Sequence, residues 1–550
     1  MKSNPAHHNQ DRSQSGGLNR RKFLGAIGSG VVALGTSGLP GIRDAIADDR
    51  NRDRGGRRFF LQEDRFGRMF PRLDPFFERP SPQLNAALLD IGKPGGVLDA
   101  KDNLAAGPVA LIVDPALNLN NPNNPTHTAG TTFMGQFMDH DMTFDLTSAL
   151  GEPTEPEDSP NARTPALDLD SVYGGGPRKS PELYEQHGRR IKFKVESGGL
   201  FEDLPRRSNN TAIIADPRND ENLMIAGLHA AVLLFHNKAV DHVTKSFPRM
   251  DSDDVFREAR RLTTWHYQWM IVHEFLPLFI GQEMVDEILH RGRKFYRPRV
   301  AFMPVEFQGA AYRFGHTMVR PSYRANLAGD NGGPFFAMIF DPAGEGQADP
   351  VDLRGGARAP RRFIGWQTFF NFGAIPRPSG VGTLGEDVRP NKLIDTRIST
   401  PLFNLPLQTI AGAVPPTPQS LPQRNLLRQV TWSLPSGQSI AREMDVEPLS
   451  RAELSELSGY GLGLDRSTPL WYYVLKEGAV RANGLTLGPV GGRIVGEVII
   501  GLLEHDRDSY LSRSPFWKPT LPTIHGPVTG DFRMIDFLAL AGVDPGSRGQ

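Results

Sequence analysis

Residues 220–247 read DENLMIAGLHAAVLLFHNKAVDHVTKSF, and this stretch decides the fold class. Its apolar residues recur at helical spacing, with no Gly or Pro break after Gly227. Residues 252–281 follow with Ser252 and acidic residues, a typical helix N-cap, and predict a long buried helix that reaches Leu276. Two long helices in the middle of the chain favour a mainly α fold.

The remaining chain adds helices and loops rather than strands. Residues 307–319 and 491–506 each predict a shorter helix, strand-like alternation is scarce, and Pro- and Gly-rich loops dominate residues 321–440. No internal repeat is visible, so residues 72–545 are interpreted as one domain with long loops and little β structure. The charge-dense residues 48–71 predict a flexible segment, and 546–550 a short tail.

Composition excludes several classes of protein. The chain has 550 residues with 62 basic and 62 acidic side chains, so it carries no electrostatic signature for nucleic acid or an anionic membrane. It contains no cysteine, which excludes disulfides, thiolate catalysis, iron–sulfur clusters and cysteine zinc sites. No stretch after the N-terminus reads as a membrane span. Any metal must use histidine or oxygen ligands, or enter inside a cofactor.

The N-terminus indicates export. Arg20 and Arg21 precede a weakly apolar, Gly-rich run, and a small-residue cleavage site follows at Ala45–Ala47. This pattern predicts a twin-arginine signal peptide over residues 1–47 and a partner in the twin-arginine export machinery. The expected location is periplasmic or extracellular, in a prokaryote.

Three polar motifs stand in apolar surroundings. TTFMGQFMDHDMTFD (131–145) flanks His140 with two aspartates, and DPRNDEN (216–222) precedes the long helix. AYRFGHTMVRPSY (311–323) places a histidine after a glycine. Taken singly, these motifs also fit a polar helix end, a surface turn and a packed core histidine; the first also fits part of a non-haem metal site.

Taken together, their order and wording resemble the animal-type haem peroxidase superfamily. GQFMDHDMTF resembles its distal-histidine segment, DPRNDENLMIAGLHAAVLLFHN its catalytic-arginine segment, and AYRFGHTMVRP its proximal-histidine segment. REARRLTTWHYQWMIVHEFLPLFIG is similar to the helix after the arginine, and RNLLRQVTWSLP to a segment with an Asn and an Arg. The resemblance covers most of residues 72–545 and implies the haem peroxidase fold.

The resemblance implies a haem held from the proximal side. His316 would be the axial ligand to the haem iron, and Asn425 would accept a hydrogen bond from its other ring nitrogen. Arg313 and Arg428 would lie near the haem propionates. The absence of cysteine excludes a thiolate ligand, which agrees with the histidine ligand that the resemblance implies.

It also implies the distal machinery. His140 would take the proton of bound hydrogen peroxide and return it to the outer oxygen. Arg218 would stabilise the charge that develops, and Gln136 would orient distal water or halide. The implied activity is oxidation of a small donor (halide, pseudohalide or phenol) through a ferryl intermediate.

Two carboxylates match residues that form ester bonds to haem methyl groups in mammalian members. Asp139 and Glu221 are both present, which permits either haem b or an ester-linked haem. Asn222 stands where a sulfonium link would need methionine, so no third link is expected.

Calcium would explain the second aspartate beside the distal histidine. The family joins Asp141 to a loop that is similar to TPALDLDSVYGGG (164–176). The implied oxygen ligands, which suit calcium, are Thr164, Ala166 through its carbonyl, Asp168 and Asp170.

Four other histidines could suggest a metal site, and two alternative functions are compatible with the sequence. His229, His236, His266 and His273 are interpreted as packed or hydrogen-bonded rather than metal-binding. A haem-dependent fatty-acid dioxygenase is one alternative function. Its radical-forming tyrosine would stand where Arg313 lies, and Tyr312 is expected on a different helical face. A non-catalytic extracellular haem module is the other alternative.

Overall fold

The computed structural model describes residues 65–197, 201–356, 361–373, 388–410, 417–524, 526, 528 and 530–545. Within these residues the protein is mainly α, as the sequence predicts. The predicted signal peptide, residues 48–64 and the predicted tail lie outside the described residues.

Helices form most of the regular secondary structure in the described residues. The helices are α3 (Pro82–Ile91), α4 (Gly107–Val113), α5 (Gly130–Met142), α6 (Asp170–Tyr173), α7 (Leu223–Ser246), α8 (Ser252–Met270), α9 (Leu276–Ile280), α10 (Gln282–Arg291), α11 (Val305–Gln308), α12 (Gly315–Met318), α13 (Leu421–Thr431), α14 (Gly437–Glu443), α15 (Leu470–Ala482), α16 (Pro489–His505), α17 (Tyr510–Arg513) and α18 (Met534–Ala541).

In the part of the chain that the structure describes, the strands form only two-stranded pairs. These are parallel β1 (Phe66–Gly67) with β5 (Met303–Pro304), and antiparallel β2 (Asn123–Thr128) with β8 (Pro390–Lys392), β3 (Glu196–Ser197) with β4 (Glu202–Asp203), and β6 (Ser322–Asp330) with β7 (Gly333–Met338).

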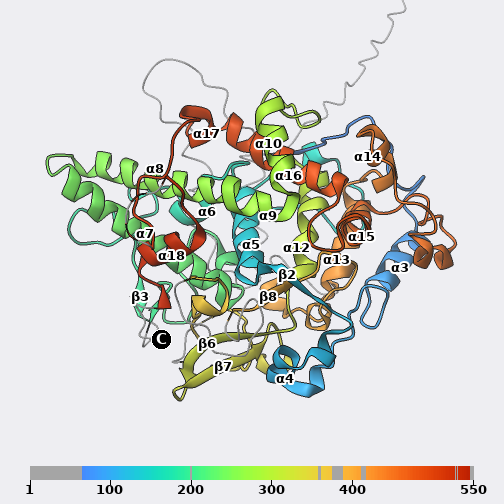
Figure 1. Ribbon diagram of the computed structural model, residues 1–550, viewed down its shortest axis with the longest axis horizontal. Coiled ribbons are helices and arrows are strands. Elements are labelled where there is room, and N and C mark those ends of the chain that lie inside the picture. Colours follow the sequence, from blue (N-terminus) through green and yellow to red (C-terminus); the bar gives the residue numbers. More distant parts are fainter. Residues whose placement is uncertain are drawn as a thin grey trace, which may run out of the picture.

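Helix α7 confirms the opening stretch as a core helix. Asn222 caps it by accepting a hydrogen bond from the Ile225 amide. Its length and hydropathy would suit a membrane span, contrary to the expectation that no such stretch follows the N-terminus. However, 83% of its apolar window is buried inside the protein. Its apolar surface therefore packs in the core, against α8 and α18 (Figure 1).

The second long helix is continuous but not uniform. Asp251, not Ser252, is its N-cap and accepts from the Asp254 amide. A π-helical turn, Ile271–Phe275, joins α8 to α9. Pro277 stands in the first turn of α9, where its missing N–H costs nothing, so the helical path continues past Leu276.

The predicted helix over residues 307–319 is wrong in detail. The chain forms α11, a 3₁₀ turn at Ala311–Phe314, and then α12. Ala310 lies outside the helical region, with φ −138° and ψ −76°, which separates α11 from the turn. The two breaks change which side chains share a face.

Two β features depart from the expectations. The β6–β7 hairpin lies in a region that was expected to be loops. Asn331 (φ 52°) and Gly332 (φ 86°) supply its turn, and this Asn-Gly pair is a hairpin signal in the sequence. Residues 65–71 are not free either. Strand β1 pairs with β5, and the buried Glu306 accepts hydrogen bonds from the amides of Met69 and Phe70.

Helix α5 lies near the middle of the molecule, between the α7–α8 region and α12 (Figure 1). Phe133, Phe137 and Met138 are buried in the core. A Cβ at Gly135 would lie 3.1 Å from the ring of Phe275, so this glycine permits close packing against the π-helical turn. Such packing fixes the position of the polar residues at the end of α5.

Candidate functional site

A cavity of about 270 Å³ brings the three polar motifs together. Helix α5, the 3₁₀ turn Pro217–Asp220, the segment Ala311–Met318 and α13 all contribute to its wall. Eight of the predicted site residues line it: Gln136, Asp139, His140, Arg218, Glu221, Arg313, His316 and Arg428. Asn425 contacts His316 behind the wall.

His140, which the sequence predicts to be the distal histidine, is buried. His140 is 4% exposed, and its Nδ1 lies 2.9 Å from Oδ1 of Asn219. Burial, followed by the positive charge of Arg218, lowers the pKa of His140 to about 3. Its Nε2 lies 3.6 Å from Oε1 of Glu221, on the cavity wall. Gln136 and His140 line the same cavity, as their helical spacing predicts.

Arg218 is fixed by three acceptors. Its guanidinium donates to the carboxylate of Asp216 and to the backbone carbonyls of His140 and Thr143, with donor–acceptor distances of 2.8–3.1 Å. The ring of Phe144 lies 4.0 Å from its central carbon. These contacts tie Arg218 to the C-terminal end of α5, the helix that carries His140.

Asp216 is a site residue that the sequence reasoning missed. Its side chain is 0% exposed and lies between Arg218 and Arg163, with ion-pair distances of 2.8 and 2.7 Å. Burial alone would raise the pKa of Asp216, but the two arginines outweigh burial and hold it well below its usual value. The Asp-x-Arg spacing of Asp216 and Arg218 was the available signal.

The proximal histidine has the predicted partner in an unpredicted orientation. Nδ1 of His316 lies 2.7 Å from Nδ2 of Asn425, while the amide oxygen of Asn425 lies 3.4 Å from a guanidinium nitrogen of Arg313. Asn425 is thus the partner of His316 that the sequence predicts, with the amide nitrogen rather than the oxygen toward the ring. Metal ligation through Nε2 requires Nδ1 to donate, and hence the opposite amide orientation.

Three arginines gather on the proximal side of the cavity. Arg313, Arg424 and Arg428 all line it. Burial, followed by the charge of Arg428, lowers the pKa of Arg313 to about 9. Arg428 pairs with Asp145 at 2.8 Å, whereas no ion pair of Arg313 or Arg424 occurs within the described part of the chain. The cluster is therefore suited to bind an anionic group.

Arg424 was not predicted, although it precedes Arg428 by one helical turn on α13. Tyr312 also departs from expectation, because it lines the same cavity as Arg313 instead of facing elsewhere. Its hydroxyl donates to the Gly135 carbonyl at 3.0 Å.

Two partly buried carboxyl groups, Asp139 and Glu221, face the cavity. Burial raises the pKa of Asp139, and it raises that of Glu221 to about 8. Glu221 accepts a hydrogen bond from the amide of Gln136. Glu221 therefore lies between Gln136 and His140 and can hold a proton near neutral pH.

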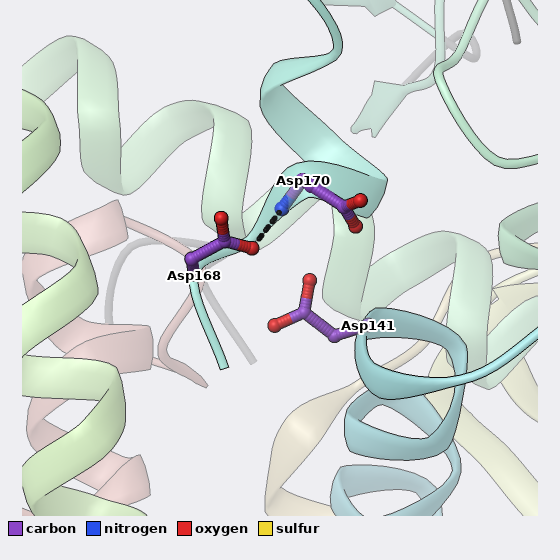
Figure 2. A group of neighbouring side chains, drawn as sticks. All are labelled: Asp141, Asp168 and Asp170. Atoms are coloured by element: carbon purple, nitrogen blue, oxygen red, sulfur yellow. Dashed lines mark hydrogen bonds between the residues drawn. The ribbon is translucent and has the colours of Figure 1, made fainter. Parts of the chain in front are cut away.

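A cluster of three aspartates lies at the C-terminal end of α5, where Asp141 follows His140. Ligand oxygens of Asp141, Asp168 and Asp170 all lie within 4.8 Å of one another. Asp168 and Asp170 flank one loop turn, and Asp141 points toward them from α5 (Figure 2). Burial, followed by the charge of Asp170, raises the pKa of Asp141 to about 8. Asp141 also accepts hydrogen bonds from the Leu169 amide and the Ser171 hydroxyl, each at 3.0 Å.

The other predicted ligands lie in the same loop. The amide and hydroxyl of Thr164 donate to Asp170 at 3.2 and 3.3 Å, and the buried Ala166 follows in the same turn. Nη1 of Arg163 is 3.6 Å from Oδ1 of Asp170, which has no hydrogen-bond partner. The cluster thus has more carboxylate charge than nearby donors satisfy.

The four histidines that were interpreted as packed are indeed packed or hydrogen-bonded. His229 pairs with Asn219, His236 with Tyr173 and the Ile191 carbonyl, His266 with the Leu262 carbonyl, and His273 stacks on Trp269.

Comparisons with known proteins point to one family. Residues 145–342 match the model of the animal haem peroxidase family. Chorion peroxidase of Aedes aegypti is 28% identical over 173 residues, which are 29% of this chain and 22% of that protein. Human eosinophil peroxidase is 27% identical over 238 residues, 37% of this chain and 32% of that protein. The aligned parts thus span less than two thirds of either relative.

Solved structures share the fold. Peroxidase A from Dictyostelium discoideum has a TM-score of 0.54 at 16% identity and covers 82% of this chain and 89% of its own. A fatty acid α-dioxygenase from Oryza sativa has a TM-score of 0.50 at 14% identity and covers 70% of each chain. The family match includes Arg218, Glu221, Arg313 and His316, while the structural likeness extends over more of the chain. Residues 145–342 therefore contain a match to an animal haem peroxidase domain, and the chain is similar to proteins named as peroxidases.

Proposed function

We propose that the protein is a haem peroxidase that uses hydrogen peroxide to oxidise a small donor such as a halide, pseudohalide or phenol. The observation that carries this proposal is the cavity itself. Two histidines from distant parts of the chain, His140 and His316, line it together with several arginines. The match of residues 145–342 to the animal haem peroxidase model supports the reaction class.

The cavity residues fit a haem. Its wall combines an imidazole, a cluster of arginines and a large apolar surface, which suit iron, propionates and the porphyrin ring respectively. The buried oxygens of Thr143 and Gln308, which also line the cavity, have no hydrogen-bond partner. The apolar lining includes Phe133, Phe275, Phe314, Met318, Val319, Ile339, Phe340, Leu402, Leu405 and Ile410.

On this proposal the proximal residues hold the cofactor. His316 would ligate the iron through Nε2, with Asn425 accepting from Nδ1. Arg313 and Arg424 would pair with the propionates, joined by Arg428. Asp139 and Glu221 face the cavity, as ester attachment of the haem would require. When bound, the haem supplies the iron redox chemistry that splits the peroxide O–O bond.

The distal residues handle the proton and the charge. His140 is neutral, so its Nε2 can accept a proton from hydrogen peroxide and later return it to the departing oxygen. The guanidinium of Arg218 places a permanent positive charge on the cavity wall, which favours negative charge on that oxygen. Gln136 would orient small molecules beside Glu221.

The direct test is peroxide-dependent oxidation of guaiacol by the haem-loaded protein. We expect turnover that requires hydrogen peroxide, and steady-state kinetics across bromide, iodide, thiocyanate and phenols would identify the donor. Oxygen uptake with linoleate, in the absence of any peroxidase activity, would instead establish a fatty-acid dioxygenase. Neither activity in a haem-loaded protein would leave a non-catalytic haem module.

We also propose export and calcium binding. The twin arginines and the Ala45–Ala47 site support translocation to the periplasm or the exterior, and N-terminal sequencing of the exported protein should begin at Asp48. Calcium would occupy the cluster of Asp141, Asp168 and Asp170, with Thr164 and Ala166 supplying further oxygens.

Adding calcium to the metal-free protein is expected to raise its thermal midpoint. An ion that binds only the folded state, present at a free concentration about 100 times its dissociation constant, stabilises that state by about 2.7 kcal/mol. Differential scanning calorimetry with EGTA and with calcium measures the effect. Asp168→Asn should reduce the shift because one carboxylate charge is lost, whereas the exposed Asp158→Asn should not. An equal shift in wild type and Asp168→Asn would place the ion elsewhere.

A further inference from the structure

A row of three buried polar side chains runs from the cavity into the core. His140 belongs to α5, Asn219 to the 3₁₀ turn Pro217–Asp220, and His229 to α7. Oδ1 of Asn219 lies 2.9 Å from Nδ1 of His140, and its Nδ2 lies 2.9 Å from Nδ1 of His229. Asn219 is 0% exposed, so solvent cannot replace either partner.

The chemistry of the amide sets the tautomer of the distal histidine. An amide oxygen only accepts hydrogen bonds, so Nδ1 of His140 must carry the ring proton. In the neutral imidazole with its proton on Nδ1, Nε2 keeps a lone pair. That nitrogen faces the cavity wall near Glu221, where a proton from a ligand would have to be received.

His229 sets the orientation of the amide. Its Nδ1 accepts from Nδ2 of Asn219, which leaves Oδ1 as the end that faces His140. His229 is itself 1% exposed and does not line the cavity. Without this acceptor, the buried Nδ2 would lose its partner and the amide could rotate.

We propose that Asn219 is the positioning residue that holds His140 as a base, and that His229 anchors Asn219 in turn. This inference deepens the proposed peroxidase function and rests on it. Asn219 acts through His140 and touches no reacting atom. It should therefore affect those steps in which His140 receives a proton and leave later oxidation of the donor unchanged.

The test compares Asn219→Leu, which has a similar size but no acceptor, with Asn219→Asp, which keeps an oxygen toward Nδ1. Two quantities are measured on the haem-loaded protein: the stopped-flow rate constant with hydrogen peroxide, and the dissociation constant of cyanide from the shift in haem absorbance. Hydrogen cyanide must lose a proton to bind as the cyanide anion. Its dissociation constant therefore reports the ability of His140 to accept a proton, without turnover.

For Asn219→Leu we expect the peroxide rate constant to fall, and the cyanide dissociation constant to rise, by about 10- to 100-fold. Haem content and the rate of donor oxidation should stay at the wild-type level, and Asn219→Asp should recover most of both losses. Equal losses in the Leu and Asp variants, or none in either, would overturn the proposal.

A second variant, His229→Leu, tests the proposal without changing Asn219 itself. His229→Leu leaves Asn219 in place and removes only its anchor, so both quantities should change in the same direction but by less. Wild-type values for this variant would overturn the anchoring role. If the wild-type protein lacks peroxidase activity, the proposed function fails, while cyanide binding still decides the role of Asn219.

Discussion

Replacing Arg163 with Met is expected to lower the free energy of unfolding by about 3–5 kcal/mol, because it leaves buried carboxylates without their counter-ion. The guanidinium of Arg163 is 0% exposed and donates to Asp216 at 2.8 Å and to the Ala215 carbonyl at 3.1 Å. It also approaches Asp170 at 3.6 Å. Urea unfolding of the metal-free protein measures the change.

A surface pair provides the matched control. Arg178 contacts Asp253, and these side chains are 64% and 52% exposed. Arg178→Met removes the same charge from solvent-exposed surroundings, where an ion pair contributes little, so the unfolding midpoint should hardly move. A loss in Arg163→Met no larger than that in Arg178→Met would show that the buried network does not stabilise the fold.

Arg163 also connects the two ends of the site. It contacts Asp170 in the aspartate cluster and Asp216, and Asp216 holds Arg218 at the distal wall. The buried chain of ion pairs therefore joins the proposed calcium ligands to the proposed charge stabiliser. Calcium at the cluster would compete with Arg163 for Asp170, which gives the metal a structural route to the position of Arg218.

The sequence predicted the reactive residues of the site better than the residues that hold them. His140, Arg218 and His316 stand in ordered motifs, and the structure places all three on one cavity. Arg163 and Asn219 were missed because their partners lie far along the chain: Asp216 is 53 residues from Arg163, and His140 is 79 residues from Asn219. Spacing in the sequence cannot reveal such contacts.

The same reasoning explains the errors in the fold. Helices α7 and α16 follow from apolar periodicity, since each buries a wide face in the core. The break in residues 307–319 does not, because it depends on the backbone conformation at Ala310. The β6–β7 hairpin carried a local signal at Asn331 and Gly332, which the general excess of Gly and Pro obscured.

Replacing His140 with Ala is expected to slow the reaction with hydrogen peroxide by about 10²- to 10⁴-fold, the usual contribution of a general acid–base group. The haem content should stay near that of wild type, because His316 and the arginine cluster lie on other elements, α12, the Ala311–Phe314 turn and α13. Stopped-flow mixing with peroxide measures the rate, and the haem absorbance per protein measures occupancy.

Two further variants distinguish a role in the reaction from a role in haem binding. His316→Ala should lose haem and activity together, because it removes the only side chain proposed to ligate the iron, while the exposed His290→Ala should change neither. The contrast separates a residue that reacts from one that binds. Haem loss in His140→Ala equal to that in His316→Ala would instead assign His140 to cofactor binding. An unchanged peroxide rate in a haem-loaded His140→Ala protein would require another base on the cavity wall. The first candidate to replace would be Glu221, which has a pKa of about 8 and a carboxylate oxygen 3.6 Å from Nε2 of His140.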